Sequence, residues 1–471
     1  MKRTRIVVIG AGSASFGLTN LGAILRTPEL HGSELCLVDL NAEGLRLVNA
    51  LAQRMNDAWG AGFTVRSGTD RRSMLADADF VILSVAVDRE KCWEIDFRLA
   101  QKHGIMHYAE NGGPGGLMHA SRNLALIMPI LRDIERLCPE ALVLNFTNPV
   151  PRICAAAARH TTVRMIGICH QIEFGYTIVA RVLADELDLP VARDYLFRWN
   201  ERTEKLYPAI VEAAEKRIDI QAAGINHFTW MLSVRERATG RDLYPLFRQK
   251  YLAGFRDFEP LTRRLFELMG TCPVPGDCHM VEYLPFTHTM AKGLWEKYDV
   301  QMYPLRERAA ERDVMWGQIE KMANGAQSFD HLRGVHTERA ELIMAAIVTN
   351  SHAVEPAINL PNRGCIENLP PGSIVEVPAE VSAGGVRGIG VGRLPEEVAE
   401  LCRRQIAVAE LAVDAAVLGD RQRALKALLL DQMIDDPDTA VALLDDYLEA
   451  ERPYVPQFFA APSWMSQGSR P

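Results

Sequence analysis

The stretch Arg5-Ile6-Val7-Val8-Ile9-Gly10-Ala11-Gly12-Ser13-Ala14-Ser15-Phe16 sets the fold class of the first third of the chain. Its apolar run, Ile6 to Ile9, predicts a buried strand, and the pattern that follows predicts a helix over 16–25. Gly10 permits a tight turn between them, and Gly12 lets the backbone approach a pyrophosphate at the positive end of the helix. Ser15 replaces the third glycine of the usual pattern, so the match to a dinucleotide-binding turn is partial.

An acidic residue extends this pattern. Asp39 ends the second predicted strand, 34–39, where a carboxylate accepts hydrogen bonds from both ribose hydroxyls and repels a 2′-phosphate. The sequence therefore predicts NAD rather than NADP, and we assign to the cofactor site Gly10, Gly12, Ser13, Phe16, Asp39 and Asn145. The alternative is a degenerate turn of the same fold that binds no nucleotide.

The first third of the chain alternates short apolar runs with helical patterns. Asn41 is a suitable N-cap for a helix that places on one face Leu45, Val48, Leu51 and Met55. Further strands are predicted at 63–66, 80–85, 141–145 and 163–167. This rhythm predicts an α/β fold, a Rossmann-type doubly wound parallel sheet that resembles the one in lactate and malate dehydrogenases.

The rhythm becomes irregular after about residue 170. Two Pro/Gly-rich loops, 271–277 and 360–372, and a long helical stretch near 395–449 predict a second, mixed α/β domain. We therefore divide the chain into an NAD-binding Rossmann domain, residues 1–170, and a catalytic and oligomerisation domain, residues 171–471. Because no Gly/Ser linker separates the two, the site is expected in the cleft between them.

Composition limits the class of partner. The formal net charge of −8 argues against a nucleic-acid partner, and no apolar run is long enough to span a bilayer. Nine cysteines are dispersed without Cys-x-x-Cys pairs, which is typical of reduced thiols in a cytoplasm. We therefore expect a cytoplasmic protein whose partner is a small molecule, with neither nucleic-acid nor membrane partners.

Polar residues gather where predicted strands end. Asn145 and Asn148 follow one strand and Cys169-His170 the next, so these side chains can reach a ligand beyond the carboxyl ends of the sheet. A glycine-rich loop after Glu110 and the pair Asn226-His227 lie elsewhere in the chain. A cysteine thiolate and an imidazole from separate loops can together hold a divalent cation. The alternative is a buried thiol beside a packed imidazole ring.

Together these motifs resemble glycoside hydrolase family 4, the NAD- and manganese-dependent glycosidases, over nearly the whole chain. The motifs that carry the resemblance are Gly10–Phe16, Glu110 with Gly113-Pro114-Gly115-Gly116, Asn145-Phe146-Thr147-Asn148-Pro149, Cys169-His170, Ile225-Asn226-His227, Gly276–Tyr283, Asn362-Arg363-Gly364 and Val375–Pro378. The resemblance implies hydrolysis of small glycosides through oxidation at C3, loss of the C2 proton, departure of the C1 substituent, addition of water and final reduction. It also implies NAD and Mn²⁺, or another divalent cation, as cofactors, and a homodimer or homotetramer.

The resemblance assigns binding roles to single residues. It implies Cys169 and His227 as the metal ligands, with His227 also lining the substrate site. Glu110 and Asn148 are implied to line the pocket for the sugar and the cofactor.

Catalytic roles are implied in the same way. Asp277, in a Gly-Asp-x-His segment, matches the base that removes the C2 proton, and His170 is placed to protonate the departing oxygen. The alternative for Asp277 is a turn or helix-capping aspartate, for which the preceding glycine is suited. Glu282 and Glu338 are expected to be structural.

Two departures from the family pattern bear on the substrate. Gln171-Ile172-Glu173-Phe174 stands where members acting on galactosides or glucosides usually have small residues, and Arg152 stands where an apolar residue is expected. An arginine at a pocket wall suits an anionic substituent. The candidate substrates are therefore acidic sugars of the uronic-acid or sulfoquinovose type and neutral α-hexosides. The alternative for Arg152 is a surface residue paired with a helix carboxylate.

Two other functions stay open at this point. One is an NAD-dependent dehydrogenase of a hydroxy acid or sugar, and the other is a non-catalytic protein that binds NAD or a sugar. A glycosidase of the kind described regenerates its NAD in each turnover and accumulates no NADH, which separates it from a dehydrogenase.

Overall fold

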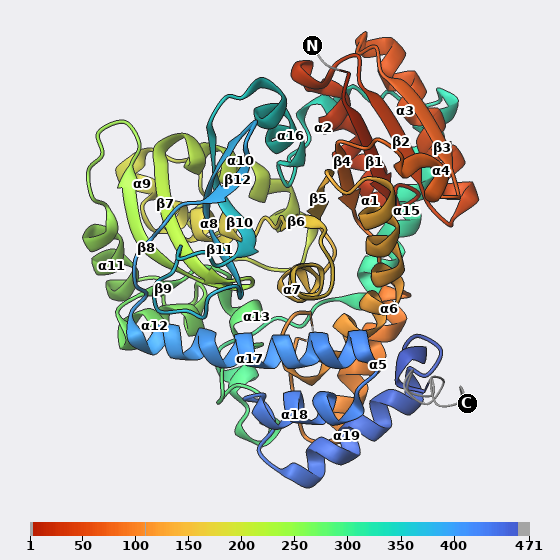
Figure 1. The fold of residues 1–471 in the computed structure, drawn as a ribbon. Helices are drawn as coiled ribbons and strands as arrows, with labels where there is room; N and C mark the ends of the chain where they lie inside the picture. Colours follow the sequence, from red (N-terminus) through yellow and green to blue (C-terminus); the bar gives the residue numbers. More distant parts are fainter. Residues whose placement is uncertain (1–2, 109, 460–471) are drawn as a thin grey trace, which may run out of the picture.

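A single sheet organises the computed structural model, which describes residues 3–108 and 110–459 (Figure 1). Its first half runs in the order β3-β2-β1-β4-β5-β6, and every neighbouring pair is parallel. These strands are β1 (Arg5–Ile9), β2 (Glu34–Val38), β3 (Thr64–Gly68), β4 (Phe80–Leu83), β5 (Leu142–Asn145) and β6 (Arg164–Gly167). This is the strand order of a Rossmann dinucleotide-binding fold, so the predicted fold class is confirmed.

The second half continues the same sheet with antiparallel strands. Its strands are β7 (Ile218–Ile225), β8 (Phe228–Glu236), β9 (Cys272–Pro273), β10 (Ala353–Pro361), β11 (Ile374–Ser382) and β12 (Gly385–Gly388). β10 joins the parallel half where Asn359 pairs with Gly167 of β6, and β11 joins β7 where Glu376 pairs with Gly224. Because one continuous sheet contains strands from both sides of residue 170, the domain boundary placed there stays a prediction.

Helices of the first half connect and cover the parallel strands. They are α1 (Ala14–Leu18), α2 (Asn20–Arg26), α3 (Ala42–Trp59), α4 (Arg72–Leu75), α5 (Arg89–Lys102), α6 (Gly113–Leu137) and α7 (Val150–His160), with a 3₁₀ turn, η1 (Pro28–Leu30).

Helices of the second half lie around the antiparallel strands, along the bottom of the view, and against helices of the first half (Figure 1). They are α8 (Ile172–Val182), α9 (Ala184–Leu187), α10 (Glu201–Arg217), α11 (Tyr244–Ala253), α12 (Pro260–Met269), α13 (Gly276–Met280), α14 (Leu294–Lys297), α15 (Leu305–Asn324), α16 (Ala340–Thr349), α17 (Glu396–Leu418), α18 (Arg421–Leu430) and α19 (Pro437–Ala450), with the 3₁₀ turns η2 (Met290–Lys292), η3 (Asp330–Gly334) and η4 (Pro456–Phe458). Among the described residues, none of these helices combines the length and apolar character that crossing a membrane requires.

The core forms on both faces of the parallel strands. Alternate residues of β1 point to opposite faces, so Ile6 and Val8 belong to one apolar cluster and Val7 and Ile9 to another. A strand that is buried on both faces has a continuous run of apolar residues, which is why β1 could be predicted from the sequence.

The predicted start of α3 is confirmed. Asn41 Oδ1 accepts a hydrogen bond from Gly44 N at 3.1 Å, as an N-cap does. All four apolar residues predicted on one face of this helix, Leu45 to Met55 at helical spacing, are buried.

One predicted helix and one predicted helical stretch are each divided in the structure. The helix predicted at 16–25 is α1 followed by α2, with the break at Thr19, because a glycine, a threonine and an asparagine at 17–20 are weak helix formers. The stretch predicted at 395–449 is three helices. Gly419 ends α17 with φ +66°, and Asp420 and Asp436 cap the next two helices through their side chains.

A buried charge network attaches the C-terminal helices to the first half. Arg122 of α6 donates to both oxygens of Glu451, at 3.0 and 3.1 Å, and to Asp96 of α5 at 2.8 Å. All three side chains are at most 1% exposed. Removing Arg122 takes the cation away from two buried carboxyl groups, which is the costly case for buried ion pairs.

We predict that Arg122→Met lowers the free energy of unfolding by ~3–5 kcal/mol, because it leaves two buried carboxyl groups without their cationic partner. Chemical denaturation monitored by circular dichroism measures this. The matched control is Arg132→Met on the same helix, whose pair with Glu135 is exposed and contributes at most ~1 kcal/mol. Equal losses in the two variants would contradict the prediction.

Candidate functional site

Parallel pairing brings the polar loops together at one edge of the sheet. Leu83 pairs with Asn145 and Asn145 with Gly167, so the chain leaves β4, β5 and β6 at the same level. Asn145 is fully buried, and its side chain donates to Thr147 O at 3.0 Å and accepts from Thr147 N at 3.1 Å. Its side chain shapes the turn, so its contact with the cofactor stays a prediction.

The glycine-rich turn is closely packed against its neighbours. A Cβ atom at Gly10, where φ is +97°, would lie 1.8 Å from Ser84 O, and one at Gly12 would lie 2.8 Å from Asp39 Cβ. Asp39 accepts hydrogen bonds from Gly12 N and Asn41 N, both at 2.8 Å. The turn therefore requires glycine at both positions, and Asp39 stands beside it at the end of β2.

Ser13 and Phe16 occupy the start of α1. Ser13 Oγ accepts from Phe16 N at 3.2 Å, which caps this short helix. The Phe16 side chain is 1% exposed and belongs to the core. Their assignment to a cofactor stays a prediction, in which Phe16 would act through its backbone.

Cys169 and His227 meet although 58 residues separate them. Cys169 follows β6, and His227 lies in the tight turn between β7 and β8. Cys169 Sγ lies 3.0 Å from His227 Nε2. Burial lowers the pKa of His227 well below its ordinary value, so the imidazole is neutral and offers a lone pair. The structure therefore brings together the two residues that were expected to share a cation.

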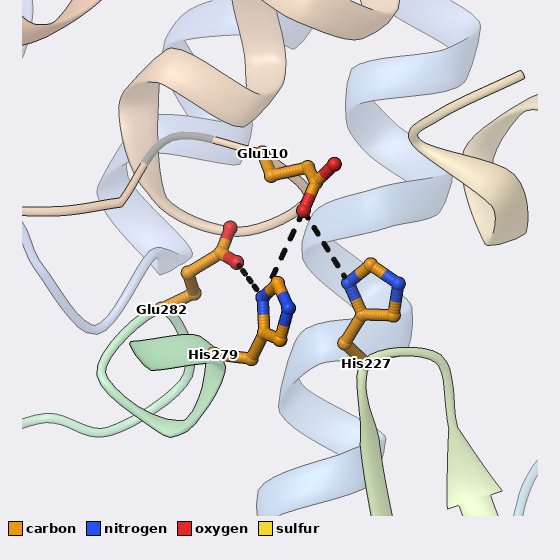
Figure 2. Close-up of side chains that lie close together, drawn as sticks. All are labelled: Glu110, His227, His279 and Glu282. Carbon is orange, nitrogen blue, oxygen red and sulfur yellow. Dashed lines mark hydrogen bonds and ion pairs between the residues drawn. The ribbon is translucent and has the colours of Figure 1, made fainter. Parts of the chain in front are cut away.

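A second group of possible metal ligands lies on the Nδ1 side of the His227 imidazole (Figure 2). Glu110 Oε2 is 3.8 Å from both His227 Nδ1 and His279 Nδ1, and His279 Nδ1 is 3.2 Å from Glu282 Oε1. These four side chains are buried, and their donor atoms lie within 4.8 Å of one another. The group has the size and chemistry to hold a cation, and it shares His227 with Cys169.

Two members of this group were not assigned a role at the site by sequence reasoning. His279 appeared only as part of a motif, and Glu282 was expected to be structural. Their spacing of three residues places them on one side of a helical turn, which is the one local signal for their pairing. Glu282 Oε2 also accepts from Asn111 N at 2.6 Å and Gly112 N at 2.9 Å, so it does support the backbone.

Glu110 and Asn148 form a pair, as expected for one pocket. Asn148 Nδ2 donates to Glu110 Oε1 at 2.7 Å, and Arg89 Nη2 lies 3.6 Å from the same oxygen. Burial raises the pKa of Glu110, and the nearby Arg89 acts in the opposite direction. The pair presents a carboxylate and an amide, the groups that hydrogen-bond sugar hydroxyls.

His170 is exposed beside Cys169 and faces a carboxylate. Its Nδ1 lies 3.4 Å from Glu338 Oε1, with about half of the imidazole exposed. Partial desolvation opposes the charged form, but neighbouring carboxylates, Glu338 first, outweigh it and raise the pKa of His170 to about 9. A protonated imidazole at the mouth of the site can donate a proton.

In the structure Asp277 caps a helix, which is the alternative role considered for it above. Its two oxygens accept from Leu261 N at 2.9 Å and Thr262 N at 2.7 Å, the free N–H groups at the start of α12. Burial raises the pKa of Asp277 to about 6. Its role as the catalytic base stays a prediction that this arrangement does not favour, because both oxygens already serve the helix.

Arg152 is buried, so the surface alternative for this residue is wrong. It lies on the first turn of α7 and is 2% exposed. It lines a pocket together with Asn111, Asn226 and Gln405. Among the described residues, Arg152 Nη1 and Gln405 Nε2 have no hydrogen-bond partner. Two unpartnered N–H donors in one pocket favour an anionic or acceptor-rich ligand.

Known proteins resemble the chain over nearly its full length. The family model "Family 4 glycosyl hydrolase" matches residues 5–185, and the model for the C-terminal domain of that family matches residues 222–434. An alpha-glucosidase from Erwinia rhapontici is 31% identical, with 96% of this chain and 99% of that protein covered. An alpha-galacturonidase from Bacillus subtilis is 26% identical over 95% of this chain and 98% of that protein.

A solved structure has the same fold. It is a 6-phospho-alpha-glucosidase from gut microorganisms in complex with NAD and Mn²⁺, with a TM-score of 0.77 at 20% identity. The match covers 96% of this chain and 99% of that one.

We predict that Asp277→Ala destabilises the fold, because each buried N–H at the start of α12 that loses its acceptor costs ~1–3 kcal/mol. The free energy of unfolding from urea denaturation measures this. Asp194→Ala serves as control, since Asp194 pairs with Arg202 at the surface, where such a pair contributes at most ~1 kcal/mol. An unchanged stability of Asp277→Ala would contradict the capping role.

Proposed function

Because the chain belongs to the family 4 glycosyl hydrolases, we propose that it cleaves small glycosides by oxidation, elimination, addition and reduction, with NAD and a divalent cation as cofactors. This is the NAD-dependent route that departs from the usual pair of carboxylates in glycosidases. The observation that carries the proposal is the meeting of Cys169 Sγ and His227 Nε2 at 3.0 Å beside the strand ends.

The glycine-rich turn fits NAD. Gly10 and Gly12 leave no room for side chains, which keeps the backbone open to a pyrophosphate. Asp39 keeps a free lone pair on each oxygen after accepting its two backbone hydrogen bonds, enough to accept from ribose hydroxyls. Its negative charge disfavours the 2′-phosphate of NADP. The NAD named in the related 6-phospho-alpha-glucosidase structure supports the same assignment.

Cys169 and His227 fit a divalent cation such as Mn²⁺. Asn111 Nδ2 lies 2.5 Å from His227 Nδ1, while Asn111 Oδ1 has no partner among the described residues. Reversing the amide lets Oδ1 accept the Nδ1 proton, which leaves the Nε2 lone pair for the cation. When bound, NAD and the cation supply a reversible hydride acceptor and a Lewis acid that together acidify the C2 proton of the sugar.

The remaining residues bind the sugar and move protons. Glu110 and Asn148 hydrogen-bond its hydroxyl groups, and Glu110 also faces the Nδ1 side of His227, where a carboxylate orients a metal-binding imidazole. His170, paired with Glu338, donates a proton to the departing oxygen.

We extend the proposal to the state of the protein in the cell. Nine free thiols in the structure support a reduced compartment, the cytoplasm. A homodimer or homotetramer stays a prediction, which the molar mass in solution tests. The partner we propose is a small glycoside, with neither nucleic-acid nor membrane partners.

The central prediction concerns isotope and cofactor balance. With NAD and Mn²⁺, a glycoside deuterated at C2 should lose its label to water while no NADH accumulates, because the hydride returns in each turnover. Asp39→Ala should weaken NAD binding in calorimetry, and Cys169→Ser should lose affinity for Mn²⁺ while its circular dichroism spectrum is unchanged. Retained deuterium, stoichiometric NADH, or full activity after chelation would each contradict the proposal.

We also propose that the sugar carries an acidic group recognised by Arg152. Its buried, unpartnered Nη1 supports an anion in the adjoining pocket. The helix N-terminus at Pro149–Arg152 adds positive charge on the same side. The relatives include both an alpha-glucosidase and an alpha-galacturonidase, so the family accommodates neutral and acidic sugars. Uronic-acid and sulfoquinovose-type glycosides are the candidates.

We predict that Arg152→Met reduces the preference for an anionic over a neutral glycoside roughly ten- to a hundred-fold, because a hydrogen bond to a charged group contributes ~1.5–3 kcal/mol. Ratios of kcat/KM for paired aryl glycosides measure this. Arg159→Met, in the exposed part of the same helix, is the control. A wild-type preference for neutral glycosides would refute the role of Arg152 without affecting the NAD-dependent mechanism.

A further inference from the structure

His279 has the arrangement of a general base, whereas Asp277 does not. The two residues lie on α13 two positions apart. Asp277 gives both oxygens to the start of α12. The Nδ1 atom of His279 is hydrogen-bonded to Glu282 Oε1. Its Nε2 atom makes no hydrogen bond within the part of the chain that the structure describes.

Glu282 holds this imidazole from a fixed position. Its Oε2 accepts two backbone N–H groups, from Asn111 and Gly112, so the carboxylate cannot rotate without losing both. Its Oε1 is then directed at His279 Nδ1, at 3.2 Å. A carboxylate at Nδ1 places the proton there, leaves the lone pair on Nε2, and stabilises the imidazolium that forms when Nε2 takes a proton.

His279 also lies next to the expected substrate position. Its ring centroid is 4.4 Å from that of His227, and the two rings are tilted by 40° (Figure 2). The rings of Tyr108 and Phe174 meet His279 edge-on, which fixes the plane of the imidazole. A sugar held at Cys169 and His227 is thus one ring away from an imidazole that its neighbours hold in place.

We propose that His279, held by Glu282, removes the proton from C2 of the sugar; this rests on the proposed function above. C3 is first oxidised to a ketone: bound NAD⁺ would supply the acceptor for the C3 hydride, and the O3 proton passes to water. The C2–H bond then breaks, an N–H bond forms at Nε2, and the electron pair of the C–H bond forms a C2=C3 enolate.

The remaining bonds change in balance. The enolate electrons form C1=C2 as the C1–O bond breaks, and the departing oxygen takes a proton from His170. Water adds to C1 and gives its second proton to His170, and the imidazolium of His279 returns its proton to C2. The hydride would then return from NADH to C3 while O3 takes a proton from water. The sum is glycoside plus water giving sugar plus alcohol, with NAD⁺ and the protonation states of both histidines restored.

The test compares His279→Gln with wild type, using a C2-deuterated glycoside, NAD and Mn²⁺. Loss of a positioned base should slow release of deuterium by ~10²–10⁴-fold. Formation of NADH on mixing, read at its absorbance band in a single turnover, should persist because C3 oxidation precedes the missing step. The affinity for Mn²⁺ should stay within a few-fold of wild type. His331→Gln, an exposed histidine on η3, is the matched control.

The possible outcomes distinguish failure of the proposed function from failure of the role of His279 alone. Retained deuterium in wild type would overturn the proposed function and this proposal with it. Release by both wild type and His279→Gln would overturn the role of His279 alone. A parallel loss of NADH formation and Mn²⁺ affinity in His279→Gln would also overturn it and make His279 a support for His227. Glu282→Gln should give a smaller loss of exchange, and loss of exchange in folded Asp277→Asn alone would transfer the role to Asp277.

Discussion

A buried carboxylate on β11 fixes the turn on which the site depends. Glu376 Oε2 accepts from Asn226 Nδ2 at 2.9 Å and from Asn359 Nδ2 at 2.7 Å. Asn226 precedes His227, and Asn359 is the β10 residue that pairs with β6. One oxygen therefore ties the His227 turn to the strand that meets the parallel half. Cys169, which follows β6, and His227 are brought within 3.0 Å by this connection.

Local signals were sufficient for much of the parallel half. The apolar run of β1, the N-cap Asn41 and the spacing of the α3 core residues all act within a few residues, so sequence alone identified them. Breaks were harder to place. Thr19 divides one predicted helix, where three weak helix formers stand at 17–20. Asp420 and Asp436 begin separate helices within the predicted helical stretch at 395–449, each as a side-chain N-cap.

Several contacts in the site could not be predicted from the sequence. The motifs that resemble family 4 located Cys169 and His227, but not the contacts of His279 and Glu282 with Glu110, which lies about 170 residues earlier in the chain. The sequence left open whether Arg152 lies at the surface or in the interior, and the packing of α17 on α7 buries it. Burial of a single charged side chain depends on such tertiary packing, and no local pattern reports it.

The two donor groups around His227 exclude one another as sites for a cation. A neutral imidazole has one ring nitrogen with a lone pair and one with a proton. If Nε2 binds a cation beside Cys169, then Nδ1 carries the proton and can only donate, to Asn111 Oδ1 or Glu110. The group of Glu110, His279 and Glu282 then loses its fourth ligand. Its two carboxylates instead face the Nδ1 atoms of His227 and His279, where each can accept a hydrogen bond. This division gives the Cys169 side of the ring to the cation and leaves the imidazole of His279 free to accept a proton.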